Sequence, residues 1–288
     1  MTPTFDRRLT PARPDLAARF LEGRVSAERF VDGVVMQVKG GVVDVKRAPR
    51  PDAGLDTQVL YGERVSVYDE QEGWAWAQLE RDHYVGWIAA NTLWSKIYAP
   101  THRVATPRTF IYPHPSIKEP PLLALPLGAE LAILGDRDAF AVTSEGGFVF
   151  RAHLVPIAAP AADFVAVAET LTGAPYLWGG KTSMGVDCSG LVQASLLIAG
   201  VDAPRDSDLQ ETMLGERVGE GAPLRRGDLV FWKGHVGIMR DAATLLHANA
   251  AHMLVVSEPL DAVRARNLAA GAGPVTSVKR LYAAAGLQ

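Results

Sequence analysis

The sequence predicts small all-β domains followed by an α+β domain. Residues from about 28 to 157 contain short apolar runs separated by turn residues such as Gly40-Gly41, a pattern typical of strands and hairpins. From Ala161 the apolar residues follow a helical period, and alternating strand patterns begin again after Gly227. Because helices come first and strands follow in this second part, we expect an α+β fold for it.

Length and composition set the outer limits. The chain has 288 residues, enough for two or three domains that each bury a core of their own. Its 48% hydrophobic and 21% charged residues are typical of a folded globular protein rather than a disordered chain. The 29 basic and 32 acidic side chains give a formal charge of -3, so we predict no binding to nucleic acid or to an anionic membrane.

The distribution of apolar residues and cysteine bears on the compartment. No apolar run of signal-peptide length follows the arginines of the first 20 residues, and no later stretch is long enough to span a membrane. Cys188 is the single cysteine, which excludes an internal disulfide and suits a reducing compartment. We therefore expect a cytoplasmic protein without membrane attachment. These observations do not bear on the oligomeric state, for which a monomer is assumed.

An internal repeat organises the first part of the chain. Five residues recur 66 positions later with unchanged spacing: Gly62, Val65, Val67, Trp74 and Trp76 are matched by Gly128, Leu131, Ile133, Phe140 and Val142. We predict two copies of one small barrel, here called module 1 (28–98) and module 2 (99–157). An N-terminal extension (1–27) precedes them, and a last domain (158–288) follows the proline- and alanine-rich segment that ends module 2.

The closing segments of the two copies carry a resemblance. Gly86-Trp87-Ile88 is echoed by Gly147-Phe148-Val149 after a hairpin shortened by five residues. These runs resemble bacterial SH3-like domains, which implies domains that bind peptides or cell-wall fragments. Most tryptophans of these modules are nevertheless expected to fill the barrel cores at alternate strand positions.

The last domain begins with two predicted helices. Phe164, Val167, Ala168 and Leu171 lie on one helical face, and Gly173 stops that helix. A second helix is predicted from Cys188 to Ala199. Strands are then predicted over four segments: Gly227 to Trp232, His235 to Arg240, Leu245 to Ala248, and Met253 to Ser257.

Cys188 is a candidate nucleophile because it opens the second helix. A helix N-terminus offers free N–H groups and the positive end of the dipole, which favour a thiolate. The sulfur also needs an imidazole that takes its proton and later protonates the leaving amine, and His235 is the best candidate. His247 lies 12 residues further, at a hairpin-like separation, and could orient the ring of His235.

Four motifs make the last domain resemble a known family. They are Pro175-Tyr176-Leu177-Trp178-Gly179-Gly180, Asp187-Cys188-Ser189-Gly190-Leu191-Val192, Gly227-Asp228-Leu229-Val230-Phe231 and Gly234-His235-Val236-Gly237-Ile238. In this order they resemble the motif set of NlpC-type cell-wall peptidases over roughly residues 160–285. The resemblance implies a papain-like fold, a triad of Cys188, His235 and His247, and no cofactor.

With two SH3-like modules in front, the architecture is similar to that of the γ-D-glutamyl-L-diamino acid endopeptidases (dipeptidyl-peptidase VI type) of murein peptide recycling. The resemblance implies that Tyr176 helps the Cys188 N–H to stabilise the oxyanion. It also implies contacts with the substrate, including its free amino end, from a further set of residues: Asp187, Ser189, Ser207, Glu63 and Tyr84.

We therefore predict a cysteine peptidase that cuts the bond between γ-D-glutamate and a diamino acid in short murein peptides beginning with L-alanine, through a thioester. Alternatives remain open. Asp187 could simply cap its helix, and Cys188, His235 and His247 could bind zinc, although no further ligand stands at suitable spacing. The chain could also be a non-catalytic binder of cell-wall peptides, or an amidase or acyltransferase that uses the same Cys-His pair.

Overall fold

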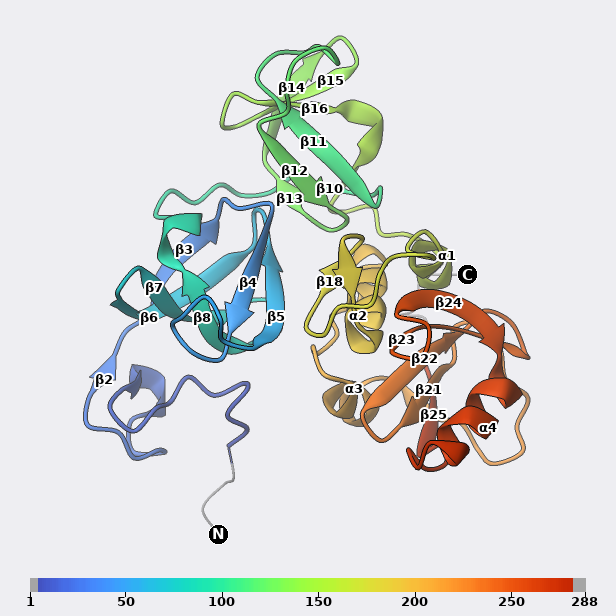
Figure 1. Cartoon of the computed structure of the whole chain (residues 1–288). Coiled ribbons are helices and arrows are strands. Elements are labelled where there is room, and N and C mark those ends of the chain that lie inside the picture. The colour runs from blue at the N-terminus through green and yellow to red at the C-terminus, as the bar shows by residue number, and fades with distance from the viewer. Residues whose placement is uncertain (1–4, 282–288) are drawn as a thin grey trace. The chain divides into compact units, whose positions relative to one another are not determined.

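The computed structural model describes residues 5–281. The chain divides into two compact units, Met1–Ile157 and Ala158–Gln288 (Figure 1). The regular structure described in the first unit is strands with three short 3-10 turns, and the second combines four helices with a six-stranded sheet in its described part. Among the helices of residues 5–281, none has the length and apolar character that crossing a bilayer requires.

Module 1 is a seven-stranded antiparallel sheet in the order β5-β4-β8-β7-β6-β3-β9. Its strands are β3 (Val34–Val38), β4 (Val42–Lys46), β5 (Leu55–Leu60), β6 (Arg64–Gln71), β7 (Trp74–Leu79), β8 (Val85–Ala89) and β9 (Leu93–Trp94), with the 3-10 turn η2 (Ala90–Thr92) before β9. Buried and less buried residues alternate along β4, as expected for a strand with one face on a core. That core consists mainly of valine and other aliphatic side chains.

The segment before module 1 packs against it. It contains β1 (Ala17–Ala18), which pairs in parallel with β2 (Phe30–Val31), and the 3-10 turn η1 (Arg19–Leu21). Leu16 is fully buried in one cluster with Trp76 and Trp87. These two tryptophans therefore pack against the preceding segment and not in the aliphatic core of module 1, where the sequence had led us to expect most tryptophans.

Module 2 has two small sheets, of order β12-β11-β16-β15-β14 and β13-β10-β17. Its elements are β10 (His102–Val104), β11 (Arg108–Tyr112), β12 (Leu123–Pro126), β13 (Glu130–Leu131), β14 (Ile133–Arg137), β15 (Phe140–Thr143), β16 (Phe148–Phe150), η3 (Arg151–His153) and β17 (Leu154–Pro156). A separate aliphatic core lies between these sheets.

The repeat seen in the sequence extends to backbone detail. Gly62 and Gly128 both have positive φ, +85° and +86°, in the left-handed region that glycine tolerates. Each donates its N–H over 2.9 Å to the carbonyl of the matched valine, Val38 or Val104. The two modules thus share their turn geometry, while the description of module 2 as an SH3-like domain stays a prediction.

The two modules meet at a tight junction. The Glu130 N–H donates to the Tyr61 carbonyl at 2.9 Å. A Cβ atom on Gly62 would lie 2.0 Å from the Glu130 carbonyl oxygen, so only glycine fits there. Arg81 completes the junction by pairing with Glu63 at 2.6 Å and with Glu130 at 2.7 Å.

The second unit contains the helices α1 (Phe164–Glu169), α2 (Cys188–Ile198), α3 (Ser207–Met213) and α4 (Leu260–Ala269). Its strands are β18 (Lys181–Thr182), β19 (Gly185–Val186), β20 (Glu216–Arg217), β21 (Leu229–Trp232), β22 (His235–Met239), β23 (Thr244–Asn249), β24 (Leu254–Pro259) and β25 (Ser277–Arg280). The large sheet has the order β20-β25-β21-β22-β23-β24, and α2 packs against β22 and β23 (Figure 1).

Of the twelve helices and strands described in the second unit, the sequence located six, with their ends within two residues. The first helix ends at Glu169 rather than Leu171, because the last turn tightens: Leu171 and Thr172 bond to carbonyls three residues back. The strand expected from Met253 begins at Leu254, since Met253 has a positive φ of 51° in the preceding turn. Helices α3 and α4 and strands β18, β19, β20 and β25 were not predicted.

Candidate active site

Helix α2 begins at Cys188 because Asp187 caps it. The Asp187 backbone is extended, and its side chain accepts the Gly190 N–H at 2.7 Å. Every residue of α2 is buried, which fixes the helix within the unit. Cys188 is itself only 7% exposed, so its thiol lies at a buried helix start.

From the sequence, this helix start was expected to favour a thiolate, but burial has the larger effect on the pKa of the thiol. Burial raises the pKa of Cys188 to about 12, and the negative charge of Asp187 acts in the same direction. Hydrogen bonds from the backbone N–H groups of Val236 and Ser189, and the charge of Arg205, oppose this shift. Cys188 is therefore a neutral thiol in the free protein, next to strand β22.

His235 and His247 lie on neighbouring strands and point toward each other. In the register of β22 and β23, Ile238 pairs with Leu246, so His247 shares a face with His235 on a diagonal. His235 Nε2 and His247 Nδ1 are 2.8 Å apart, a hydrogen-bond distance. His235 Nδ1 has no hydrogen-bond partner among residues 5–281.

The ring of His235 is packed between aromatic neighbours. Its centroid lies 5.7 Å from that of Trp232 and 5.0 Å from that of His247. Burial lowers the pKa of His235 to about 3, and the charges of His247 and Arg266 lower it further. The ring is thus neutral and able to accept a proton.

Two residues that the sequence did not reveal extend this chain of contacts. Glu258 on β24 lies 2.8 Å from His247 Nε2, and Arg266 on α4 binds both oxygens of Glu258 at 2.6 and 2.7 Å. The Arg266 hydrogen bonds lower the pKa of Glu258 to about 2, so this carboxylate is ionised. A line of four side chains therefore runs from His235 to Arg266.

Tyr176 lies close to the thiol. It precedes the short strand β18, and its backbone forms an isolated bridge with Val186, just before Asp187. Burial raises the pKa of Tyr176, and the interactions with Cys188 and Asp187 act in the same direction. The hydroxyl therefore remains protonated and can donate a hydrogen bond.

Asp187 takes part in a buried ion pair with Arg205, a residue that the sequence analysis did not single out. Arg205 is 1% exposed and binds the two Asp187 oxygens at 2.9 and 2.7 Å. The N–H of Gly179 and the hydroxyl of Ser189 also donate to Asp187. With the Gly190 N–H, five donors surround this carboxylate.

This arrangement bears on the predicted contacts with a substrate amino end. A carboxylate has about four lone-pair sites, so an ammonium bound by Asp187 would have to replace one of the present donors. Ser189 belongs to the same network, since Arg205 donates to its hydroxyl at 2.8 Å. Ser207 begins α3 and is partly exposed. The substrate roles of these residues stay predictions.

Glu63 and Tyr84, the other predicted binding residues, belong to module 1. Glu63 is 3% exposed, accepts the Leu60 N–H and pairs with Arg81 at the junction between the modules. Tyr84 and Trp87 help line a cavity of about 280 Å³. The roles of Glu63 and Tyr84 in substrate binding also remain predictions.

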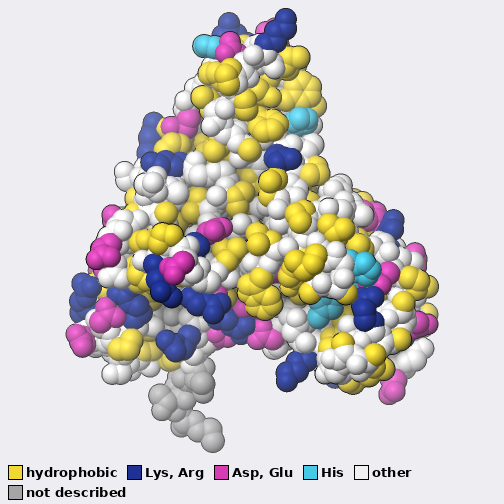
Figure 2. All heavy atoms as spheres, in the orientation of Figure 1, with side chains coloured by type: hydrophobic (Ala, Val, Ile, Leu, Met, Phe, Trp, Pro, Cys, Tyr) yellow, Lys and Arg dark blue, Asp and Glu magenta, His cyan; other side chains and the backbone are white. Residues whose placement is uncertain are grey.

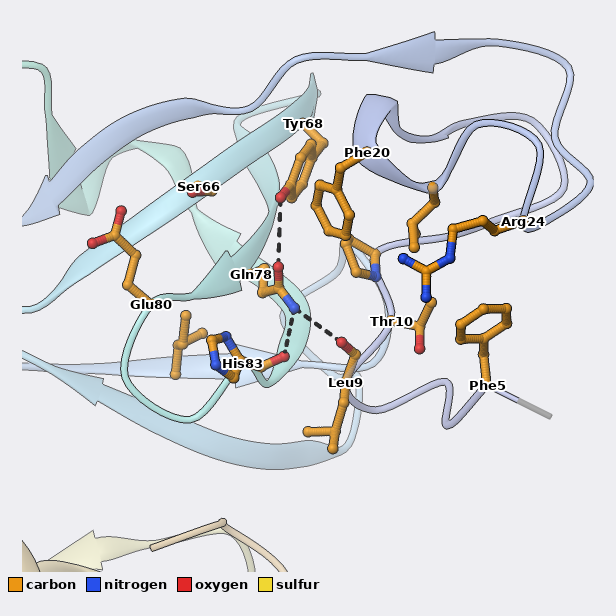
Figure 3. Close-up of a pocket in the computed structure, with 13 residues that line it drawn as sticks. Phe5, Leu9, Thr10, Phe20, Arg24, Ser66, Tyr68, Gln78, Glu80 and His83 are labelled. Carbon is orange, nitrogen blue, oxygen red and sulfur yellow. Dashed lines mark hydrogen bonds between the residues drawn. The ribbon is translucent and has the colours of Figure 1, made fainter. Parts of the chain in front are cut away.

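A second cavity lies between module 1 and the segment before it. It measures about 690 Å³, and Figure 3 shows Phe5, Phe20 and Arg24 facing Tyr68 and Gln78 across it. All its lining residues belong to the first unit. Acidic and basic side chains lie intermixed on the face of this unit that Figure 2 presents, so no broad surface of one charge is seen there.

The geometry of the histidines argues against a zinc site. His235 Nε2 and His247 Nδ1 face each other in a hydrogen bond, so these two nitrogens cannot both bind one metal ion. Within residues 5–281, no group of three or more His, Cys, Asp or Glu side chains is arranged to hold a metal.

Two segments of the chain match models of known protein families. Residues 173–269 match the model of the NlpC/P60 family, and residues 45–93 match that of the bacterial dipeptidyl-peptidase Sh3 domain. The chain is 30% identical over 228 residues to the gamma-D-glutamyl-L-lysine dipeptidyl-peptidase of Bacillus subtilis (strain 168), covering 68% of this chain and 73% of the relative. Identity to the Bacillus cereus (strain ATCC 10987 / NRS 248) protein of the same name is 27% over 239 residues, covering 72% and 71%.

A solved structure shows the same fold. The crystal structure of an NlpC/P60 family protein from Bacillus cereus ATCC 10987 superposes with a TM-score of 0.71 and 22% identity. It covers 85% of this chain and 99% of that chain. The expected papain-like fold behind an N-terminal SH3 domain is thereby confirmed, whereas the family model covers only module 1 of the two predicted SH3-like copies.

Proposed function

Because the chain belongs to the NlpC/P60 family of cysteine peptidases, we propose that it hydrolyses the γ-D-glutamyl–diamino acid bond of short murein peptides with a free N-terminal L-alanine. The observation that carries this proposal is the Cys188 thiol at the capped start of α2, beside the strand that presents His235 and its partner His247. The names of the two Bacillus relatives support the choice of bond.

The first half of the reaction follows from the neutral pair. Cys188 Sγ attacks the γ-carbonyl carbon while its proton moves to His235 Nδ1, so no stable thiolate is required. The carbonyl π electrons move to oxygen, where the Cys188 N–H and the Tyr176 hydroxyl are the proposed donors. Collapse forms the thioester and breaks the C–N bond, and His235 returns its proton to the leaving amine of the diamino acid.

The second half uses the same groups in reverse. Water gives a proton to His235 Nδ1 as its oxygen attacks the thioester carbon, and the tetrahedral oxyanion forms again. Its collapse breaks the C–S bond, leaves Cys188 as a thiolate and releases L-Ala-γ-D-Glu as a carboxylic acid, which loses its proton to solvent. The proton on His235 then returns to Sγ, which restores the neutral pair.

The proposed setting is the recycling of murein peptides in the cytoplasm. A reactive cysteine that has no disulfide partner is better preserved in a reducing compartment, which supports this setting. A requirement for the free amino end would keep the enzyme from stems whose L-alanine is still joined to glycan. Contacts of that amino end with Asp187, Ser189, Ser207, Glu63 and Tyr84 are part of the proposal.

The test uses defined peptides. We expect L-Ala-γ-D-Glu-diamino acid to yield the dipeptide L-Ala-γ-D-Glu and the free diamino acid, identified by mass. The N-acetylated peptide should react roughly 30- to 1000-fold more slowly in kcat/KM, because acetylation removes a charge that the binding groups pair with. Equal rates on both peptides would show that the amino end is not read and would favour an endopeptidase acting on intact wall.

A metal test separates this mechanism from the zinc alternative. Activity should survive dialysis against a chelator and should be lost on alkylation of Cys188. Because the thiol is neutral and buried, alkylation should be slow at neutral pH. Restoration of a chelator-treated enzyme by added zinc would instead support a metal mechanism.

A further inference from the structure

We propose that Glu258 is a positioning residue that sets the tautomers of His247 and His235, and that Arg266 holds it in place. The tautomer assignment concerns the histidines alone. Its consequence for catalysis rests on the function proposed above. Glu258 does not touch Cys188 in this scheme and acts only through the two rings.

The strand register brings the three side chains into line. His247 on β23 pairs with Val256 on β24, so Glu258, two residues further, shares its face on a diagonal. His235 has the same diagonal relation to His247 across β22 and β23. Three adjacent strands thus present His235, His247 and Glu258 in sequence on one face of the sheet.

The carboxylate determines where the proton of His247 lies. Glu258 Oε1 is ionised and 2.8 Å from His247 Nε2, so an unprotonated Nε2 would place two electron pairs against each other. The Asn249 amide nitrogen also approaches Nε2, at 3.0 Å. A charge-assisted hydrogen bond is about twice as strong as a neutral one, so Nε2–H donates to Glu258, and the Asn249 amide, itself a donor, then makes no hydrogen bond to Nε2.

The remaining assignments follow in order. A neutral His247 with a proton on Nε2 has a free lone pair on Nδ1, which must accept from His235 Nε2–H at 2.8 Å. The neutral ring of His235 then carries its lone pair on Nδ1. This is the nitrogen that has to accept the Cys188 proton. The opposite tautomer of His247 would place a proton on His235 Nδ1 and block that transfer.

Charged and titratable groups on several neighbouring elements affect the protonation of His235 and His247. Glu258 on β24 favours the protonated rings, whereas Arg266 on α4 and His252 in the preceding turn act against protonation of His247. Arg266 also acts against protonation of His235. Arg266 therefore has two effects: it holds Glu258 with two hydrogen bonds and offsets its charge.

The first experiment reads the tautomers directly, without substrate. In 15N-labelled protein, long-range 1H–15N spectra of the imidazoles distinguish Nε2–H from Nδ1–H, and seven histidines are few enough to assign by single substitution. We expect Nε2–H for both His235 and His247 in the wild-type protein. In Glu258→Leu, the Asn249 amide becomes the nearest partner of Nε2 and should convert His247 to Nδ1–H.

A double variant separates a tautomer effect from general damage. In Glu258→Leu with Asn249→Ala, neither the acceptor nor the competing donor remains, so His247 should populate both tautomers and activity should partly recover. Disruption of the strand would instead make the double variant worse than the single one. Recovery is expected only if the proton position on His247 limits the reaction.

Activity measurements use opposite charge changes. Glu258→Leu should lower kcat by roughly 10- to 1000-fold with little change in KM, and should move the acidic limb of the kcat/KM profile to lower pH. Arg266→Met keeps the acceptor, so it should retain most of kcat and move that limb to higher pH. If Glu258 and Arg266 had purely structural roles, the two substitutions would not move the acidic limb of the kcat/KM profile in opposite directions.

Glu169 provides a matched control. Like Glu258, it is an ion-paired carboxylate of the second unit with a pKa near 2, bound by Arg226 and Arg240 but with no contact to a histidine. Glu169→Leu should change neither the tautomers nor the pH profile. An Nδ1–H signal for His247 in the wild type, or an unchanged tautomer in Glu258→Leu, would overturn the proposal.

A failure of the proposed function and a failure of the proposed role of Glu258 would give different results. If murein peptides are not cleaved but the tautomers respond as described, the positioning role of Glu258 stands and the substrate assignment is wrong. If the peptides are cleaved but the tautomers do not respond, only the role of Glu258 is wrong.

Discussion

The carboxylate of Asp187 and the guanidinium of Arg205 form a buried ion pair at the start of α2, 2.7 Å apart at the closest atoms. The pair lies directly beside the nucleophile, since Asp187 precedes Cys188 in the chain. A buried pair of this kind stabilises a structure only while both partners are present, because either charge alone would stay desolvated. The helix start therefore depends on a residue 18 positions further along the sequence.

Arg205→Leu should lower the free energy of unfolding by about 3–5 kcal/mol, because it leaves the Asp187 charge buried without its partner. Urea denaturation measures this loss. Adding Asp187→Asn should recover part of it, since no buried charge then remains. Arg264→Leu is the control: its pair with Asp261 is exposed to solvent, so stability should hardly change.

Cys188→Ala should abolish turnover of the tripeptide while the circular dichroism spectrum stays that of the wild type. Cys188→Ser should fail as well, because the hydroxyl is a much weaker acid than the thiol and the neutral His235 is a weak base. His235→Ala should be comparably severe, whereas His247→Ala should retain partial activity because it orients the base. Turnover within a few-fold of wild type in Cys188→Ala would contradict the cysteine-peptidase mechanism.

Tyr176→Phe should lower kcat by roughly 10- to 1000-fold and leave KM nearly unchanged, as expected when a donor acts mainly on the oxyanion. The raised pKa of Tyr176 keeps its proton in place at any working pH. Steady-state kinetics on the tripeptide provides the measurement. Tyr112→Phe, in module 2, is the control and should leave kcat and KM unchanged. If Tyr176→Phe also left them unchanged, Tyr176 would not be an oxyanion donor.

The buried Cys188 and the partly buried His235 should make stability fall toward both ends of the pH scale. The pKa of His235 is lowered from 6.5 to about 3, so between these values the unfolded chain binds more protons and stability decreases as pH falls. The pKa of Cys188 is raised from 9.0 to about 12, so over that interval stability decreases as pH rises. Urea unfolding near pH 5, 7 and 10 tests both slopes.

Two substitutions assign these slopes to their groups. Cys188→Ala should remove most of the loss between neutral and alkaline pH, because no thiol then titrates in the unfolded chain. His235→Phe should likewise reduce the loss on the acidic side. Slopes that match the wild type in both variants would mean that other groups cause the pH dependence.

The sequence predicted the parts of the site that depend on local signals. Cys188 follows a capping residue at the start of an apolar run, and the separation of His235 and His247 is that of a hairpin pair. Both signals involve short stretches of chain whose geometry is set by neighbouring residues. The structure places these side chains on α2, β22 and β23, on the elements that were expected.

Arg205 and Glu258 were missed for different physical reasons. Arg205 reaches Asp187 from a loop, where neither helical nor strand period predicts which residue approaches. Glu258 depends on the exact register of β23 and β24, and a slip of one residue would present Ser257 on that face instead. The left-handed turn at Met253, which sets this register, has no glycine to mark it in the sequence.

The junction between modules 1 and 2 has a consequence for how the first unit unfolds. In a linear array of repeats, stability is the sum of what each copy contributes and a coupling between neighbours. Here the coupling includes a main-chain hydrogen bond from Glu130 to Tyr61, the close approach at Gly62 and the Arg81 bridge. If one module unfolded, the other would lose these contacts. The two modules should therefore unfold together in one cooperative transition.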